Sequence, residues 1–130
     1  MWWASFYKGR QLVGVSILST GDEQHPTPRG RFNIQQKDAH HMSSQYGDYI
    51  DDAGNVLASN IDRHSDPMPP GGRFDGARMP FFMRFTSGIG MHAGYLPGYP
   101  ASHGCVRMPE RMARIFFDNV TVGTPVDVRY

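Results

Sequence analysis

The residues best suited to chemistry lie between Met91 and Pro109, in the run MHAGYLPGYPASHGCVRMP. The run holds the only cysteine, Cys105, with His103 two residues before it and His92 thirteen before it. A thiol attacks as the thiolate and needs a base to form it near neutral pH, so this combination is typical of a cysteine nucleophile. A lone cysteine is also often a small buried apolar residue. Gly104, which lets the backbone turn sharply before the cysteine, favours catalysis.

Length and composition set the outer limits on structure and partners. The 130 residues predict one domain, and 15 glycines with 10 prolines favour strands and loops over a helical bundle. A net charge of +1 gives no reason to expect a nucleic acid or membrane partner. A single cysteine excludes an internal disulfide, which leaves a reducing compartment or an exported protein whose thiol serves chemistry. No signal peptide or membrane-spanning run is visible, so we expect a mature or trimmed chain.

Other histidines and aspartates could be considered as ligands of a metal site. His40 and His41 are adjacent, and neighbours on an extended backbone point to opposite faces, so they seldom share an ion. No CxxC or HExxH pattern occurs. The acidic turn Asp51–Asn55 lacks the alternating ligands of a calcium loop, and His25 is expected on a surface loop. We therefore expect neither a metal nor a cofactor.

The hydrophobic patterns predict mostly strands with one main helix. Lys8–Arg10 is the expected turn of an N-terminal hairpin, whose second strand has a β-branched face of Val13, Val15 and Ile17. The strand that ends at His92 would carry that histidine to the site. The strands are expected at Trp3–Tyr7, Gln11–Ser19, Arg31–Gln36, Phe81–Thr86, Gly88–His92 and Pro125–Tyr130.

The helix is expected over Pro109–Asp118. Proline suits the first helical position, and Met112, Ile115 and Phe116 have the spacing of a buried helical face. Because this helix starts four residues after Cys105, its positive end could stabilise a thiolate if it points there.

Residues 38–80 carry little periodic signal. More than forty such residues inside a compact domain are usually a functional lid or disordered, and scattered aromatic residues favour a lid. A small hairpin is expected within Gly47–Ser59. Asp38–Met79 holds seven aspartates against three arginines, so the rest of the chain is correspondingly basic. We expect one domain over residues 1–130 with this segment as a lid or insertion within it.

Four stretches together resemble a known family, the YkuD-type catalytic domain of L,D-transpeptidases. They are TPRGRFNI, MPFFMRF, the run from MHAG to SHGCVRMP, and GTPVDV, and the resemblance covers nearly the whole chain from about Phe6. It implies a β-sandwich with a packed helix. It also implies work on peptidoglycan outside the cytoplasmic membrane, and therefore an exported protein in the periplasm or cell wall.

The resemblance also implies roles for individual residues. Cys105 would be the nucleophile and His92 its general base, oriented by the main-chain carbonyl of Ala93. Backbone amides around His103, Gly104 and Cys105 would hold the oxyanion, and His103 would help to shape the pocket. The substrate-binding positions would be Arg107, Ser102, Tyr95, Met83 and Ala93. The gap between His92 and Ser102 is shorter than is common in the family, and Arg107 stands where many members have Asn.

The predicted activity is a cysteine acyl transfer. By the resemblance, Cys105 would attack a tetrapeptide stem at the L-centre of its diaminopimelate and release D-Ala, and an amine of a second stem would then form a 3→3 crosslink. An imidazolium beside the thiol would lower its pKa. Two alternatives stay open: a carboxypeptidase or amidase that uses water on the same stems, and a non-catalytic wall-binding module.

Overall fold

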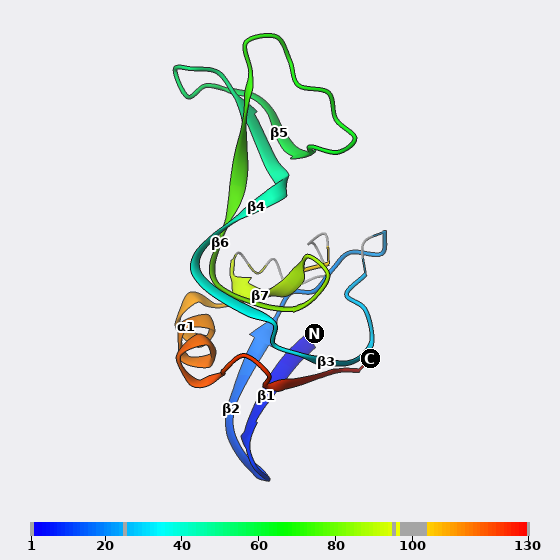
Figure 1. Cartoon of the computed structure of the whole chain (residues 1–130), viewed down its shortest axis with the longest axis vertical. Coiled ribbons are helices and arrows are strands. Elements are labelled where there is room, and N and C mark those ends of the chain that lie inside the picture. Colours follow the sequence, from blue (N-terminus) through cyan, green and yellow to red (C-terminus); the bar gives the residue numbers. More distant parts are fainter. Residues whose placement is uncertain (1, 25, 95, 97–103, 130) are drawn as a thin grey trace. The chain divides into compact units, whose positions relative to one another are not determined.

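The computed structural model describes residues 2–24, 26–94, 96 and 104–129 (Figure 1). Strands dominate, and one helix lies between the last two of them, so the expectation of a mostly β fold with one main helix is confirmed. The elements are β1 (Trp2–Lys8), β2 (Gln11–Leu18), β3 (Gly30–Asn33), β4 (Gln36–Ile50), β5 (Val56–Asp62), β6 (Arg73–Thr86), β7 (Ile89–Ala93), β8 (Val106–Met108), α1 (Glu110–Asn119) and β9 (Pro125–Val128).

The strands form three sheets. β1 pairs with β2 and β3 with β9, both antiparallel, and the third sheet has the order β5-β4-β6-β7-β8. The chain also divides into two compact units. Unit 1 comprises Met1–His40 and Pro80–Tyr130, and unit 2 comprises His41–Met79. β4 and β6 each contribute residues to both units.

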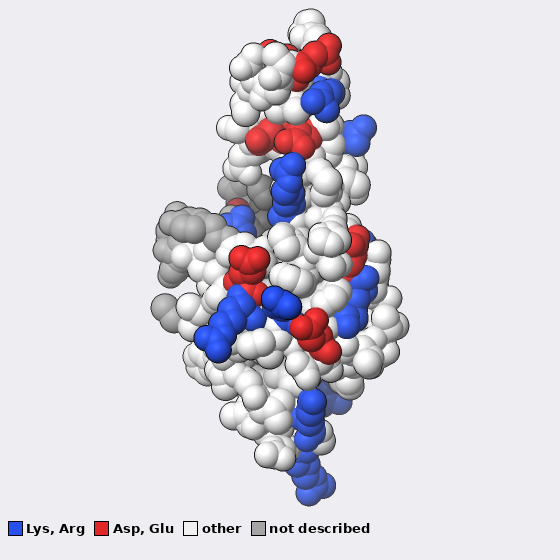
Figure 2. Space-filling view, turned by 90° about the vertical axis from the view of Figure 1, so that its left-hand side faces the viewer, with Lys and Arg blue, Asp and Glu red and all other residues white. Residues whose placement is uncertain are grey.

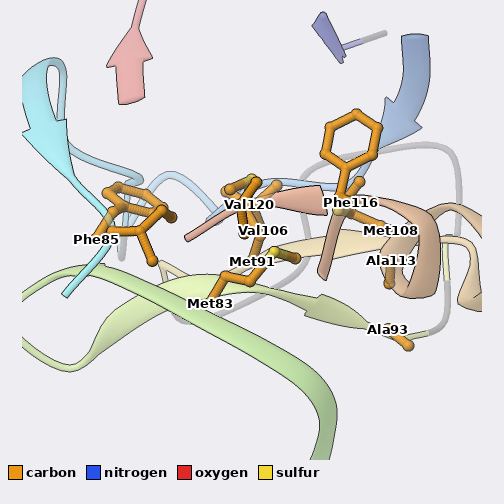
Figure 3. Packing of buried hydrophobic residues seen from close by; sticks show 10 residues of the cluster. Met83, Phe85, Met91, Ala93, Val106, Met108, Ala113, Phe116 and Val120 are labelled. Atoms are coloured by element: carbon orange, nitrogen blue, oxygen red, sulfur yellow. The ribbon is translucent and has the colours of Figure 1, made fainter. Parts of the chain in front are cut away.

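The hydrophobic core of unit 1 is built mainly from α1 and the strands β6, β7 and β8 (Figure 3). Phe116 of α1 meets Phe6 of β1 edge to face, with ring centroids 5.3 Å apart. Such pairs add a small stabilisation to the burial of their area. The buried members of the cluster are Ile34, Met83, Phe85, Met91, Ala93, Val106, Met108, Ala113, Phe116 and Val120.

One detail of the expected hydrophobic pattern is wrong, and the structure also shows which face of β2 is exposed, a point that the sequence left open. Ile115 is 42% exposed, and Ala113 and Phe116 are the buried residues of α1. In β2 the β-branched residues face outward, with Ile17 half exposed, whereas Ser16 is buried. A Cβ at Gly14 would lie 3.7 Å from the Phe116 ring, so this glycine of β2 lies against the large ring of the helix.

Unit 2 is more regular than its sequence suggests. The segment predicted to be irregular contains parts of β4 and β6 and all of β5. The expected small hairpin is present, with Tyr49 opposite Ala58 and Ile50 opposite Val56. The sequence hides these strands because their residues are mostly polar and show little alternation. The lid role of residues 38–80 stays a prediction.

Charged side chains of both signs are spread over the surface in view in Figure 2. The β1–β2 hairpin ends at the lower end of Figure 1, where Lys8 closes β1 and Arg10 lies in the turn, and the charged side chains in view there are basic. Across the described ranges, no helix has the length and apolar character needed to cross a membrane.

Candidate active site

The candidate site is built on β7 and β8, which run parallel. Met91 lies opposite Val106, His92 opposite Arg107 and Ala93 opposite Met108. Side chains alternate along a strand, so residues in register share one face. Met91, Ala93, Val106 and Met108 all belong to the hydrophobic core. We call the opposite side of these strands the site face.

Cys105 comes directly before β8, and the same alternation puts it on the site face together with Arg107. Its sulfur lies near the start of β7, because Sγ is 3.8 Å from the carbonyl oxygen of Gly88 and the thiol is hydrogen-bonded to the backbone of Gly90. His92 is two residues beyond Gly90 and so lies on the same face of β7. The fold therefore brings Cys105 and His92 to one side of two adjacent strands.

The ring of His92 is held in one orientation. The side chain is buried, and its Nδ1 lies 2.8 Å from the carbonyl oxygen of Ala93. A carbonyl oxygen can only accept a hydrogen bond, so Nδ1 must carry the proton and donate it. In the neutral ring this leaves Nε2 as the nitrogen that can accept a proton. Ala93 thus contributes its backbone, and its side chain is in the core.

Burial dominates the electrostatics of the cysteine. Cys105 is 8% exposed, and burial raises the pKa of its thiol above the ordinary value. The hydrogen bond from the backbone of Gly90 and the positive charges of Arg84 and Arg107 oppose this effect without reversing it. The direction is opposite to the lowered pKa that we expected from the sequence. The thiol is therefore protonated at neutral pH and needs a base at the moment of attack.

Arg84 of β6 is a charged neighbour that the sequence did not reveal. It lies opposite Gly90 in the antiparallel pair of β6 and β7, so it also belongs to the site face. The guanidinium carbon lies 5.3 Å from the centre of the Phe82 ring, and Nε donates to Gln36 at 3.0 Å. The alternation of β6 could have suggested this, but only once its register with β7 was known.

Thr27 was also missed, although it opens the TPRG stretch. It is 2% exposed, and its hydroxyl donates to the carbonyl oxygen of Gly104 at 2.6 Å. The same hydroxyl accepts from the backbone N–H of Gly21 at 3.0 Å. Gly104 has a φ of +112°, a conformation that favours glycine. A threonine between two prolines was the only sequence signal for this contact.

The predicted substrate-binding residues fall into different environments. Arg107 is half-buried, and its backbone exchanges two hydrogen bonds with Ser19, at 2.7 and 3.0 Å. Its side chain lies beside the His92 ring, because a Cβ at Gly94 would be 3.2 Å from Arg107 Cγ and 3.4 Å from His92 Cε1. Met83 is fully buried in the core, which fits a packing role and leaves no surface for a substrate.

Three of the predicted site residues lie outside the described part of the chain. They are Tyr95, Ser102 and His103. Among the described residues, no group of three or more His, Cys, Asp or Glu side chains is placed to hold a metal ion. A separate hollow of about 130 Å³ lies between the β1–β2 hairpin and α1, with Phe6, Val13 and Phe116 in its lining, and no predicted site residue within the described part of the chain lines it.

Comparison with known proteins identifies the family. The family model of the L,D-transpeptidase catalytic domain, YkuD, matches residues 1–128. No curated protein matches the sequence. Solved structures with the same fold include an L,D-transpeptidase from Mycobacterium smegmatis, with 22% identity and a TM-score of 0.66, over 93% of this chain and 51% of that one.

Two further structures agree. A mutant Enterococcus faecium L,D-transpeptidase has 19% identity and a TM-score of 0.70, over 98% of this chain and 45% of that one. L,D-transpeptidase 3 from Mycobacterium tuberculosis has 26% identity and a TM-score of 0.63, over 98% and 48%. The chain thus spans about half the length of the structures it matches. It belongs to the YkuD family of L,D-transpeptidase catalytic domains.

Proposed function

We propose that the protein is a peptidoglycan L,D-transpeptidase that works through a thioester on Cys105. The observation that carries the proposal is the pair of Cys105 and His92 on one face of two parallel strands, with the tautomer of the histidine held by the Ala93 carbonyl. A thiol on the same strand face as an imidazole whose unprotonated Nε2 can accept a proton is an arrangement suited to nucleophilic catalysis by cysteine.

The first half-reaction cleaves the donor stem. Nε2 of His92 takes the proton from Cys105 as Sγ attacks the carbonyl carbon at the L-centre of diaminopimelate. Because burial raises the pKa of the thiol, the attack needs His92 to remove this proton. The tetrahedral intermediate then collapses, the C–N bond breaks, and His92 gives its proton to the amine of the departing D-Ala. A thioester remains on Cys105.

The second half-reaction transfers the acyl group. An amine of a second stem peptide attacks the thioester carbonyl, and His92 accepts the proton that this amine loses. The C–S bond breaks, the proton passes from His92 to the sulfur, and a 3→3 crosslink is released. With water as the acceptor, the same steps give a tripeptide and a carboxypeptidase activity.

Backbone amides would stabilise the oxyanion of both tetrahedral intermediates. The N–H of Cys105 is our candidate donor within the described residues, since it belongs to the attacking residue and directly follows Gly104, whose φ is +112°. Loss of one such donor typically costs about 10²–10³ in rate. Arg107, beside His92, is the candidate to meet a carboxylate of the stem, because a planar guanidinium can bind a carboxylate through two hydrogen bonds. Since the substrate lies outside the cytoplasmic membrane, we also propose that the protein is exported.

The test is incubation with purified disaccharide-tetrapeptides and mass spectrometry of the products. We expect crosslinked dimers from the wild type and none from Cys105→Ala, and a mass increase by one carbapenem molecule in the wild type alone. The variant His64→Gln, at an exposed histidine of unit 2, is the matched control and should behave as the wild type. Tripeptide without dimer would favour the hydrolase, and an inert wild type that gains no carbapenem mass would favour the wall-binding module.

A further inference from the structure

The buried hydroxyl of Thr27 holds the peptide that joins Gly104 to Cys105. It donates to the Gly104 carbonyl oxygen at 2.6 Å across 77 residues of sequence. The direction of donation is settled because a carbonyl oxygen can only accept, and the same hydroxyl also accepts from the N–H of Gly21 at 3.0 Å. Its one proton is thus available to the carbonyl.

The planar peptide bond links the Gly104 carbonyl to the N–H of the nucleophile, Cys105. The Gly104 carbonyl and the Cys105 N–H belong to one planar unit, and no described peptide bond is cis. In a trans peptide the C=O and N–H bonds point in opposite directions. Fixing the carbonyl against Thr27 therefore fixes the direction of the Cys105 N–H, away from Thr27.

The backbone that carries Thr27 is stiff. Pro26 and Pro28 flank the threonine, each proline has a nearly fixed φ, and a residue before proline is confined to extended conformations. The side chain is 2% exposed, so water has little access to compete for the carbonyl. Gly104 itself has a φ of +112° and provides no side chain of its own to restrain the peptide.

We propose that Thr27 is a positioning residue that aims the Cys105 N–H at the oxyanion during acylation. This inference rests on the proposed acyl-transfer function and adds to it a residue that acts through the Gly104 carbonyl. Its effect should appear in reactions that build an oxyanion and be absent from reactions of the thiol that do not.

Two reactions of the Cys105 sulfur distinguish a role in oxyanion binding from a general structural role. Acylation by imipenem passes through a tetrahedral oxyanion, whereas alkylation by iodoacetamide displaces iodide and forms none. For Thr27→Val, which keeps the shape and removes the hydroxyl, we expect imipenem acylation to slow by about 10²-fold. The rate and pH profile of alkylation should stay within twofold of the wild type. Thr27→Ser, which keeps the hydroxyl, should restore acylation to within about threefold.

Equal imipenem rates for Thr27→Val and the wild type would overturn the inference. Equal slowing of both reactions would also overturn it, because that result indicates a general structural role. If Thr27→Val does not fold, Thr27→Ala is measured by the same two reactions, and the same separation is expected. A wild type that reacts with neither imipenem nor stem peptides would instead refute the proposed function itself.

Discussion

Unit 1 and unit 2 differ in how far along the sequence their polar side chains reach. In unit 1, Thr27 bonds to Gly104 across 77 residues, Lys37 to Val120 across 83 and Asn33 to Gly123 across 90. In unit 2, Asp51 accepts from the N–H groups of residues two and four positions later. The longer contact from Tyr49 to the Asp66 carbonyl spans only 17 residues.

The side-chain hydrogen bonds of unit 1 therefore need the tertiary structure to form, whereas those of Asp51 in unit 2 need only a local turn. The carboxylate of Asp51 holds its own hairpin turn, and the hydrogen bonds from Asn55 lower its pKa. The candidate site forms only when Ser19, Thr27, β6 and β7, which are far apart in the sequence, have assembled around Cys105 and β8. Matched changes in the two units should therefore affect thiol chemistry very differently, and the predictions below follow that contrast from the largest expected effect to the smallest.

The largest contrast should come from a pair of histidines. His92→Gln removes the base and should lower the turnover of tetrapeptide stems by about 10²–10⁴-fold, the usual contribution of a general base. His64→Gln in unit 2 should leave turnover within twofold. Dimer formation followed by mass spectrometry measures both. A His92→Gln variant with near-normal turnover would contradict the assignment of the base.

A pair of glycines tests the backbone of each unit. A Cβ at Gly90 would collide with the Met83 carbonyl oxygen and lie 2.8 Å from the Phe82 ring. A Cβ at Gly47 would collide with the Asp75 carbonyl oxygen and lie 2.9 Å from Gly76 Cα.

Both Gly→Ala changes should destabilise the protein, by about 1–3 kcal/mol or more in thermal unfolding, because overpacking strains the backbone. Only Gly90→Ala should also slow the alkylation of Cys105 by iodoacetamide, by tenfold or more, since β7 supports the sulfur. If Gly47→Ala slowed alkylation as much as Gly90→Ala, this contrast between the two units would be wrong.

The raised pKa of Cys105 predicts a pH dependence of stability. In the unfolded chain the thiol ionises near pH 8.5, whereas the buried thiol of the folded protein stays protonated to higher pH. The unfolded state then binds fewer protons, so this contribution is complete below about pH 8.5 and is lost as the pH rises toward the folded pKa. The loss can reach about 1.4 kcal/mol per pH unit. Denaturant unfolding of the wild type and Cys105→Ser between pH 7 and 10 measures it, and parallel curves for the two proteins would refute it.

The smallest effect is expected from Tyr49→Phe. The hydroxyl of this buried tyrosine donates to the Asp66 carbonyl oxygen at 2.5 Å, and both residues belong to unit 2. Its loss should cost about 0.5–1.5 kcal/mol of stability. Amide hydrogen exchange should report that loss in β4 and β5, with iodoacetamide alkylation of Cys105 unchanged. Faster exchange in β7 and β8 would contradict this prediction.

Local patterns predicted the elements whose sequences are periodic or clearly punctuated. The N-terminal hairpin, the helix after Pro109 and the strand that ends near His92 were all found within a few residues. β6 was found only from Phe81 onward and β4 only at its end near Tyr49, because their polar stretches in unit 2 are held by backbone pairing that leaves no hydrophobic alternation to detect. Ile115 was misplaced because helical spacing indicates a face but not which side of it the neighbouring strands cover.

The types of residue needed for thiol chemistry, and the family they resemble, could be read directly from a cysteine, two histidines and a glycine in one short run. The parallel register of β7 and β8 could not, and it is this register that places His92 and Cys105 on one face. The direction of the thiol pKa also depended on the fold, because burial is a property of everything that packs around a group. Thr27 shows the same limit: a hydrogen bond between residues 77 positions apart leaves no periodic trace, so only the folded chain reveals it.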